Sequence, residues 1–176
     1  MESTMKKILE NERLYLRELS EDDFEDLCAI LQDEETMYAY EAPFTDEEVT
    51  DWLNWNLASY QKNEFGLWAI IDKSKENFVG QCGIVYSEVE GKNLLEIGYL
   101  VNKQYWSQGY ASEASALCLN YAKNILQAQK ICSIIRDTNI ASQKVAENNG
   151  MSIVQEFYKD YSGLPVKHFV YSIDLS

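Results

Sequence analysis

The sequence predicts an α/β (α+β) fold in which a mixed sheet carries helices on both faces. Apolar β-type runs alternate with amphipathic helical segments along the chain, and the last two runs are joined by a short turn. The 176 residues are 46% apolar and include only 2 Pro and 8 Gly. This length suffices for one well-buried core and is short for two domains. We therefore expect a single domain with the element order βααββ, β, α, β, α, ββ.

The first half of the chain predicts three strands and two helices. A strand is expected over residues 13–19. Ser20 with Asp23, and Thr45 with Glu48, have the spacing of capping boxes, and each pair precedes an apolar helical stripe. Strands follow over residues 66–71 and 78–86.

Residues 94–125 join a strand, a tight turn and a helix, and this order predicts an anion site. The turn reads Tyr105-Trp106-Ser107-Gln108-Gly109-Tyr110-Ala111. The first amides of a helix lack intrahelical partners and lie at the positive end of its dipole, while glycine lets the backbone approach an anion closely. The alternative is a turn that contains glycine only because the chain bends. The segment matches neither the P-loop nor the G-x-G-x-x-G pattern, so nucleotide hydrolysis and dinucleotide redox chemistry lose support.

A second strand and helix follow about 30 residues downstream of the turn. An apolar run covers 130–135, and a helical segment then extends from Asn139 to a stop at Gly150. Two last strands are expected over 152–160 and 167–174, joined by the turn-like residues 161–165.

Together the two segments resemble the GNAT superfamily of acyl-CoA-dependent N-acyltransferases, and more narrowly its ribosomal-protein N-acetyltransferase-like branch. That branch has an E-I-G-Y strand, a W-G-Q-G-Y-A turn and an N-x-x-S-x-x-V-x-x-x-x-G-[FM] helix. The opening residues 12–17 also look like the first strand of this branch. One departure is Ser107, where the branch usually has glycine. The matching residues are Glu96, Ile97, Gly98, Tyr99, Trp106, Gln108, Gly109, Tyr110, Ala111, Asn139, Ser142, Val145, Gly150 and Met151.

The resemblance implies one GNAT domain over residues 1–176, with a mostly antiparallel mixed sheet. Its two central strands, 94–101 and 129–136, splay apart, and acetyl-CoA enters the gap as cosubstrate with its pyrophosphate on the turn. The residues expected to contact CoA are Leu100, Val101, Trp106, Ser107, Gln108, Gly109, Tyr110, Ala111, Asn139, Ser142 and Lys144. The alternatives are ordinary packing for Trp106 and a solvated side chain for Lys144.

The catalytic candidates are Glu96 and Ser142. An acceptor amine with a pKa of about 10.4 must lose a proton before it attacks a thioester. Burial would raise the pKa of Glu96 and suit it to be that base, and the alternative is a structural carboxylate. Ser142 matches a hydroxyl near the CoA sulfur, and the alternative is helix capping with Asn139. The family's frequent acid, a Tyr, is replaced by Ala146, so we expect the CoA thiolate to leave unaided.

The resemblance locates the acceptor site near Tyr38, Tyr40 and Trp55. Trp55 lies off the apolar stripe of its helix, where its ring can receive a cation, and a core or dimer contact is the alternative. Fold and cofactor site do not identify the acceptor. We expect an amine-bearing acceptor, either a protein N-terminus or a small molecule.

Composition excludes several other classes. A net charge of -14 disfavours nucleic acid as a partner, and no apolar segment is long enough for a membrane span. The four cysteines lack C-x-x-C spacing and are expected as buried thiols, with no metal site, and His168 is expected as an ordinary strand residue. We expect a cytoplasmic N-acetyltransferase that uses direct attack in a ternary complex, and exposed C-terminal strands are compatible with a homodimer. The rival is a catalytically silent acyl-CoA-binding or sensing protein.

Overall fold

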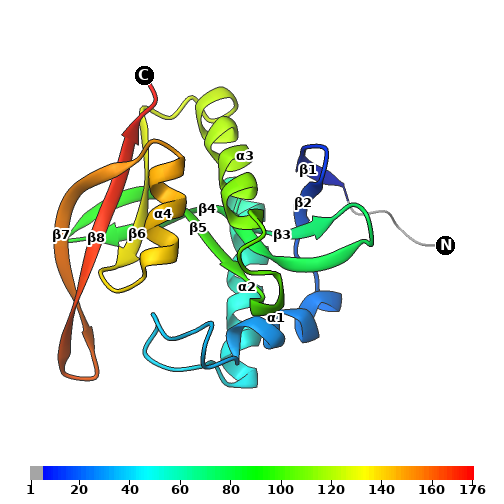
Figure 1. Ribbon diagram of the computed structural model, residues 1–176, viewed down its shortest axis with the longest axis horizontal. Helices are drawn as coiled ribbons and strands as arrows, with labels where there is room; N and C mark the ends of the chain where they lie inside the picture. Colours follow the sequence, from blue (N-terminus) through cyan, green and yellow to red (C-terminus); the bar gives the residue numbers. More distant parts are fainter. Residues whose placement is uncertain (1–5) are drawn as a thin grey trace.

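One sheet organises the molecule, as the computed structural model of residues 6–176 shows (Figure 1). Its strand order is β1-β2-β3-β4-β5-β6-β8-β7. The strands are β1 (Lys7–Glu10), β2 (Leu14–Glu18), β3 (Leu67–Asp72), β4 (Asn77–Val89), β5 (Lys92–Val101), β6 (Lys130–Arg136), β7 (Ser152–Tyr161) and β8 (Leu164–Asp174). The helices are α1 (Phe24–Leu31), α2 (Asp46–Asn63), α3 (Tyr110–Asn124) and α4 (Ile140–Asn148), with short 3-10 turns η1 (Glu21–Asp23) and η2 (Lys103–Tyr105).

The sheet is nearly divided at its centre. Neighbouring strands pair antiparallel throughout, except that β5 and β6 are parallel. These two strands meet through the single pair Glu96 and Cys132, and β5 then continues to Val101 without a partner on that side. The predicted mixed, mostly antiparallel sheet with splayed central strands is therefore confirmed.

Helices cover both faces of the sheet, as predicted. Gln81 and Cys82 are consecutive residues of β4, so their side chains point to opposite faces. Gln81 accepts a hydrogen bond from the Trp52 indole of α2 at 2.9 Å, whereas the Cys82 sulfur lies 3.7 Å from that of Cys118 in α3. Thus α2 lies on one face and α3 on the other.

The capping box predicted for α2 is formed. The Thr45 amide donates to the Glu48 carboxylate at 2.9 Å, and the Glu48 amide donates to the Thr45 hydroxyl at 3.2 Å. At the second predicted capping box, Ser20 with Asp23, the Asp23 carboxylate accepts from the Ser20 amide at 2.8 Å. It also pairs with Arg17 at 2.9 Å. The chain there forms η1 before α1 begins.

Two elements differ from the sequence expectation. Strand β1 was not predicted, because its four residues KILE are too few for an alternating pattern. The last hairpin is tighter than expected, since β7 extends to Tyr161 and β8 begins at Leu164. Ser162 and Gly163 have φ values of 52° and 91°, as a two-residue hairpin turn requires.

Three of the four cysteines are buried, and Cys28 is half-buried, contrary to the expectation that all four are buried. All four thiols are free. No helix within residues 6–176 is long and apolar enough to cross a membrane. The cytoplasmic location stays a prediction.

Candidate functional site

Two adjoining cavities open where β5 and β6 separate. The strand cavity has a volume of about 200 Å³ and is lined by β5, β6, the loop around Tyr40, and residues Lys159, Tyr161 and His168 of the last hairpin. The turn cavity has a volume of about 440 Å³ and lies between the end of β5, the start of α3 and α4. Both are lined by Thr36, Tyr99, Leu100, Asn139 and Ser142. A ligand in one cavity therefore reaches the entrance of the other.

The turn before α3 presents unpaired backbone amides. Within residues 6–176, the amides of residues 107–112 make no hydrogen bond, and the first bonded amide is that of Glu113, which donates to the Gly109 carbonyl at 3.0 Å. Most of these residues line the turn cavity. Free amides at the start of a helix bind anions such as phosphate.

Arg13 fixes the orientation of this turn. Its guanidinium donates to the Gln108 carbonyl at 2.7 Å, pairs with Glu113 at 3.0 Å and lies 3.9 Å from the centre of the Tyr110 ring. In a trans peptide the C=O and N–H point in opposite directions. Because Arg13 holds the Gln108 carbonyl on one side, the Gly109 amide points to the other.

Two residues of the turn have left-handed backbone conformations. Gly109 has a φ of 83°, which glycine adopts without strain, and Ser107 has a φ of 63°. A non-glycine residue in this region costs about 1–2 kcal/mol. Ser107 stands where the family pattern usually has glycine. Its left-handed backbone explains why glycine is favoured at this position.

Helix α4 is capped at its start and bonded to β5. Asn139 caps it by accepting from the Ser142 amide at 3.2 Å, as predicted. The Tyr99 hydroxyl of β5 donates to the Ser142 carbonyl at 2.8 Å. Within the described chain, the Ser142 hydroxyl itself makes no hydrogen bond, and it lies where the two cavities meet. It is therefore available to a ligand.

The Glu96 carboxylate lies in the strand cavity, where the two central strands separate. It accepts from the Ser87 hydroxyl at 2.6 Å and from the Ile134 amide of β6 at 3.0 Å. Burial raises the pKa of this carboxyl, while those hydrogen bonds and nearby Lys159 oppose the shift. Hydrogen bonds to Ser87 and Ile134 are what a purely structural carboxylate would make. Both Glu96 oxygens nevertheless keep lone pairs that a ligand could use.

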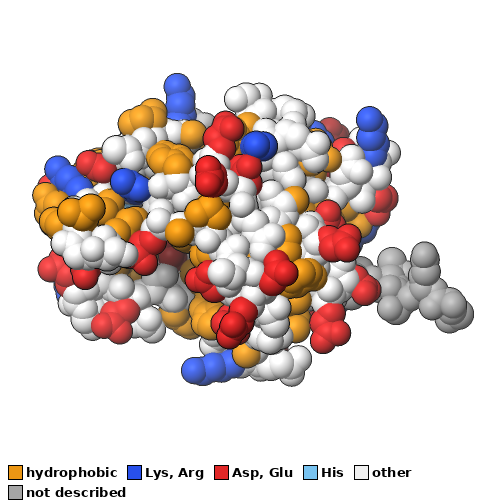
Figure 2. Space-filling view, turned by 90° about the horizontal axis from the view of Figure 1, so that it is seen from below, with side chains coloured by type: hydrophobic (Ala, Val, Ile, Leu, Met, Phe, Trp, Pro, Cys, Tyr) orange, Lys and Arg blue, Asp and Glu red, His pale blue; other side chains and the backbone are white. Residues whose placement is uncertain are grey.

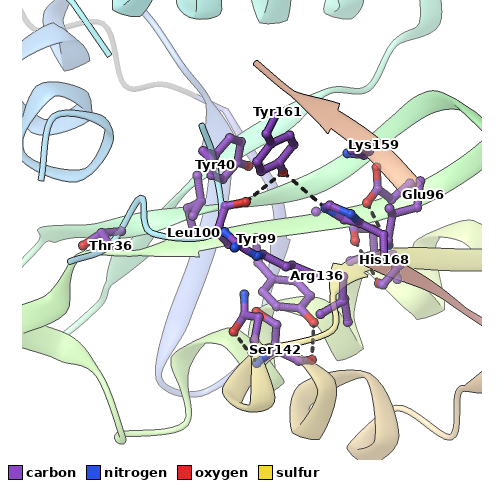
Figure 3. Close-up of a pocket in the computed structure, with 17 residues that line it drawn as sticks. Thr36, Tyr40, Glu96, Tyr99, Leu100, Arg136, Ser142, Lys159, Tyr161 and His168 are labelled. Atoms are coloured by element: carbon purple, nitrogen blue, oxygen red, sulfur yellow. Dashed lines mark hydrogen bonds between the residues drawn. The ribbon is translucent and has the colours of Figure 1, made fainter. Parts of the chain in front are cut away.

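His168 lies in a strand, β8, as expected, but the sequence did not predict that it lines a cavity. It is only 3% exposed and lines the strand cavity (Figure 3). Its Nδ1 lies 3.0 Å from the Val166 carbonyl, and its Nε2 lies 3.2 Å from the Tyr161 hydroxyl. Burial lowers the pKa of His168, which favours the neutral ring.

Most residues predicted at the site line one of the two cavities, and two do not. Glu96 and Tyr40 line the strand cavity, and Tyr38 lines the turn cavity. Gln108 lines neither cavity, and its carbonyl accepts a hydrogen bond from Arg13. Trp55 on α2 also lines neither cavity, with 51% of its surface exposed. The CoA-binding candidates that line the turn cavity are Leu100, Val101, Trp106, Ser107, Gly109, Tyr110, Ala111, Asn139, Ser142 and Lys144.

Comparison with known proteins identifies the family. The family model described as an acetyltransferase (GNAT) domain matches residues 13–152. The chain belongs to the GNAT family of acetyltransferases. Among its relatives, the uncharacterized protein YkkB of Bacillus subtilis is 37% identical over 148 residues, which cover 81% of this chain and 84% of YkkB.

Solved structures of the GNAT family share the fold. An acetyltransferase (GNAT family) from Bacillus anthracis aligns with a TM-score of 0.80 and 25% identity over 95% of this chain and 98% of its own. RimL, a ribosomal L7/L12 alpha-N-protein acetyltransferase solved in complex with coenzyme A, aligns with a TM-score of 0.80 over 97% of this chain and 98% of its own. Its identity is 17%, so this likeness concerns the fold alone.

Several side chains at the site were missed or given no role from the sequence: Arg13, Arg136, Lys159, Tyr161 and His168. Arg136 lies on β6 itself, whereas the last three reach the strand cavity because β8 pairs with β6 and β7 with β8, which puts His168 opposite Arg136. No spacing along the chain encodes that pairing. The alternation of apolar residues around His168 was the available signal, since it puts His168 on the same face as Val166 and Val170.

Proposed function

We propose that this GNAT acetyltransferase transfers an acetyl group from acetyl-CoA to a primary amine by direct attack in a ternary complex. The observation that carries the proposal is the juxtaposition of six unpaired amides at the turn with a half-buried carboxylate in the adjoining cavity. The amides suit a diphosphate, and the carboxylate suits a proton acceptor. RimL, which shares this fold, was solved with coenzyme A bound.

The residues of the turn cavity fit CoA. The free amides of Ser107, Gly109 and the first residues of α3 would bind the pyrophosphate. Lys144 would offer a cation to a further phosphate, and the pantetheine arm would follow the unpaired edge of β5 toward Ser142. Trp106 donates from its indole to the Val101 carbonyl at 2.8 Å and leaves 40% of its surface exposed beside this path.

Glu96 acts as the base, directly or through water. The acceptor ammonium gives one proton to Glu96, and the resulting amine attacks the thioester carbonyl. The new C–N bond forms and the C–S bond then breaks, so that CoA leaves as the thiolate. The second amine proton passes to solvent, or it reaches the thiolate through the free Ser142 hydroxyl, which would give its own proton to the thiolate and take the amine proton in exchange.

The carbonyl oxygen becomes negative during this attack and needs donors. The Ile97 carbonyl accepts from Ser133 of β6, so the backbone groups of Ile97 face the gap. Residues alternate sides along a strand, so the Tyr99 amide faces the same gap, beyond the last pair with β6. A fixed backbone donor at such a position stabilises an oxyanion.

The rival function is a catalytically silent acyl-CoA-binding or sensing protein. Its support is Ala146, which is fully buried where many family members have a tyrosine acid. The strand cavity beside Glu96 favours the enzyme, because a sensor has no need of an acceptor site. Thiol released from acetyl-CoA should be measured with a broad panel of amines. Acceptor-dependent release supports the enzyme, whereas tight CoA binding without such release supports the silent protein.

A further inference from the structure

The lining of the strand cavity carries more positive than negative side chains, whereas the whole molecule is strongly negative. The chain carries a net charge of -14, and acidic side chains are scattered over the face shown in Figure 2. In the strand cavity, however, the ionisable lining groups include one carboxylate, Glu96, and two cations, Arg136 and Lys159 (Figure 3). The neutral ring of His168 adds no charge. This local excess of cations needs a separate explanation.

Arg136 lacks an acidic partner. Within residues 6–176 its guanidinium forms no ion pair, and its one hydrogen bond goes to the Tyr38 carbonyl at 2.8 Å. It lies 5.7 Å from the centre of the Tyr161 ring, and its Nε is buried with no partner. A guanidinium has five N–H donors, and a buried donor without a partner is unfavourable. Because Arg136 lines the strand cavity and only one of its N–H groups is bonded, its guanidinium can offer further donors to an anionic ligand there.

Lys159 is the second cation on the same cavity. Its ammonium also forms no ion pair in the described part of the chain, although Glu96 is close enough for Lys159 to lower the pKa of that carboxyl. Several other lysines of residues 6–176, such as Lys62 and Lys130, also form no ion pair, and Lys159 differs from them in lining the strand cavity. Arg136 and Lys159 thus line the same cavity as Glu96, and the two cations outnumber this one carboxylate.

On the basis of the N-acetyltransferase function proposed above, we infer that the acceptor is a small amine that also carries a carboxylate, as an amino acid does. Arg136 and Lys159 bind the carboxylate, and Glu96 takes the proton of the amine. A guanidinium binds a carboxylate through parallel hydrogen bonds, which also orients the amine. A polyamine has only positive charges and would face two cations.

The size of the cavity agrees with a small acceptor. Its volume of about 200 Å³ lies below the roughly 300–1,000 Å³ of most ligand pockets. The hairpin and the loop around Tyr40 enclose it, since the Tyr161 hydroxyl donates to the Ala39 carbonyl at 2.8 Å. A single amino acid suits this space better than an extended peptide.

Matched acceptors test the inference directly. Thiol release from acetyl-CoA should be compared for several α-amino acids, their α-amides, the corresponding amines without a carboxyl group, dipeptides and spermidine. We expect kcat/KM for the acids to exceed that for the amides by at least about tenfold, because charge-assisted hydrogen bonds are lost. Equal or faster turnover of amides, dipeptides or spermidine overturns the inference and leaves the proposed function intact. Release with no acceptor in the panel overturns both.

Variants assign the effect to the two cations. Lys159→Gln changes an exposed side chain and should leave the fold intact. Arg136→Lys keeps a positive charge beside the loop that contains Tyr38. We expect Lys159→Gln and Arg136→Gln to raise KM about tenfold for the acids and clearly less for the amides, and Arg136→Lys to recover part of the loss. Because Lys159 also lowers the pKa of Glu96, any change in kcat should be shared by acids and amides. Lys167→Gln is the control, because Lys167 lies on β8, pairs with Glu156 and does not line the cavity. Equal rises in KM for acids and amides in Lys159→Gln overturn the inference.

Discussion

At the scale of single residues, the role of Glu96 depends on its protonation. Burial raises the pKa of Glu96 above its ordinary value of 4.5, and only the ionised form accepts a proton. Activity should therefore fall as the pH drops through this raised pKa, and recover above it. We expect Glu96→Gln to lower kcat by about 10²–10⁴-fold and to abolish this acid limb. The measurement is kcat against pH at saturating acceptor.

The companion measurement is the affinity for CoA. Glu96 lines the strand cavity and not the turn cavity, so Glu96→Gln should bind CoA as the unmodified protein does. Unchanged turnover in Glu96→Gln would leave this residue with the structural role that its bonds to Ser87 and Ile134 suggest.

Arg13 acts on the turn rather than on the chemistry. Removing its guanidinium frees the Gln108 carbonyl and lets the following peptide rotate, so the Gly109 amide loses its fixed direction. We expect Arg13→Gln to weaken CoA binding about tenfold, while the free energy of unfolding changes by only about 0–1 kcal/mol, since the pair with Glu113 is partly exposed. Calorimetric titration of CoA gives the affinity, and thermal unfolding gives the stability.

Lys73→Gln is the matched control for Arg13→Gln. Lys73 forms a comparable surface pair with Glu10 at 2.7 Å and makes no bond to the turn. A similar loss of CoA affinity in both variants would mean that general surface charge, and not the orientation of the turn, accounts for the effect.

At the scale of elements, the bond from Tyr99 to the Ser142 carbonyl connects β5 to α4 across the gap. Tyr99→Phe removes this one hydrogen bond and keeps the ring. We expect the free energy of unfolding to fall by about 0.5–1.5 kcal/mol, and KM for acetyl-CoA to rise, because α4 forms one wall of the turn cavity. Denaturant unfolding and initial rates test both parts. Tyr158→Phe is the control, since Tyr158 is 63% exposed and its hydroxyl has no hydrogen bond in the described chain.

Local signals predicted most of these elements from the sequence. Thr45 and Glu48 form the capping box that their spacing predicts, and Asn139 caps α4. The anion site at the turn was also predictable from the sequence, because the first amides of any helix lack partners within the helix. Arg136 and His168 could not be placed, since their proximity depends on the pairing of β6 with β8, which is set by packing over the whole sheet. The sequence thus predicts the turn cavity better than the strand cavity.

At the scale of the whole molecule, the gap between β5 and β6 separates two parts of the sheet. One side contains β1 to β5, and the other contains β6, β8 and β7. The crossing interactions among strands include one backbone pair, the Glu96 contact to Ile134, and the Ser133 hydroxyl on the Ile97 carbonyl. A ligand that fills this gap adds contacts to both sides at once.

Acetyl-CoA should therefore stabilise the fold as well as serve as substrate. A ligand at a hundredfold excess over its Kd adds about 2.7 kcal/mol to the free energy of unfolding. For a chain of this size that corresponds to a rise in Tm of roughly 5–10 °C. Thermal unfolding with and without acetyl-CoA measures the shift, and NAD, which shares the diphosphate but lacks the pantetheine arm, is the control. Absence of a shift would contradict CoA binding, and an equal shift with NAD would mean that only the turn contributes.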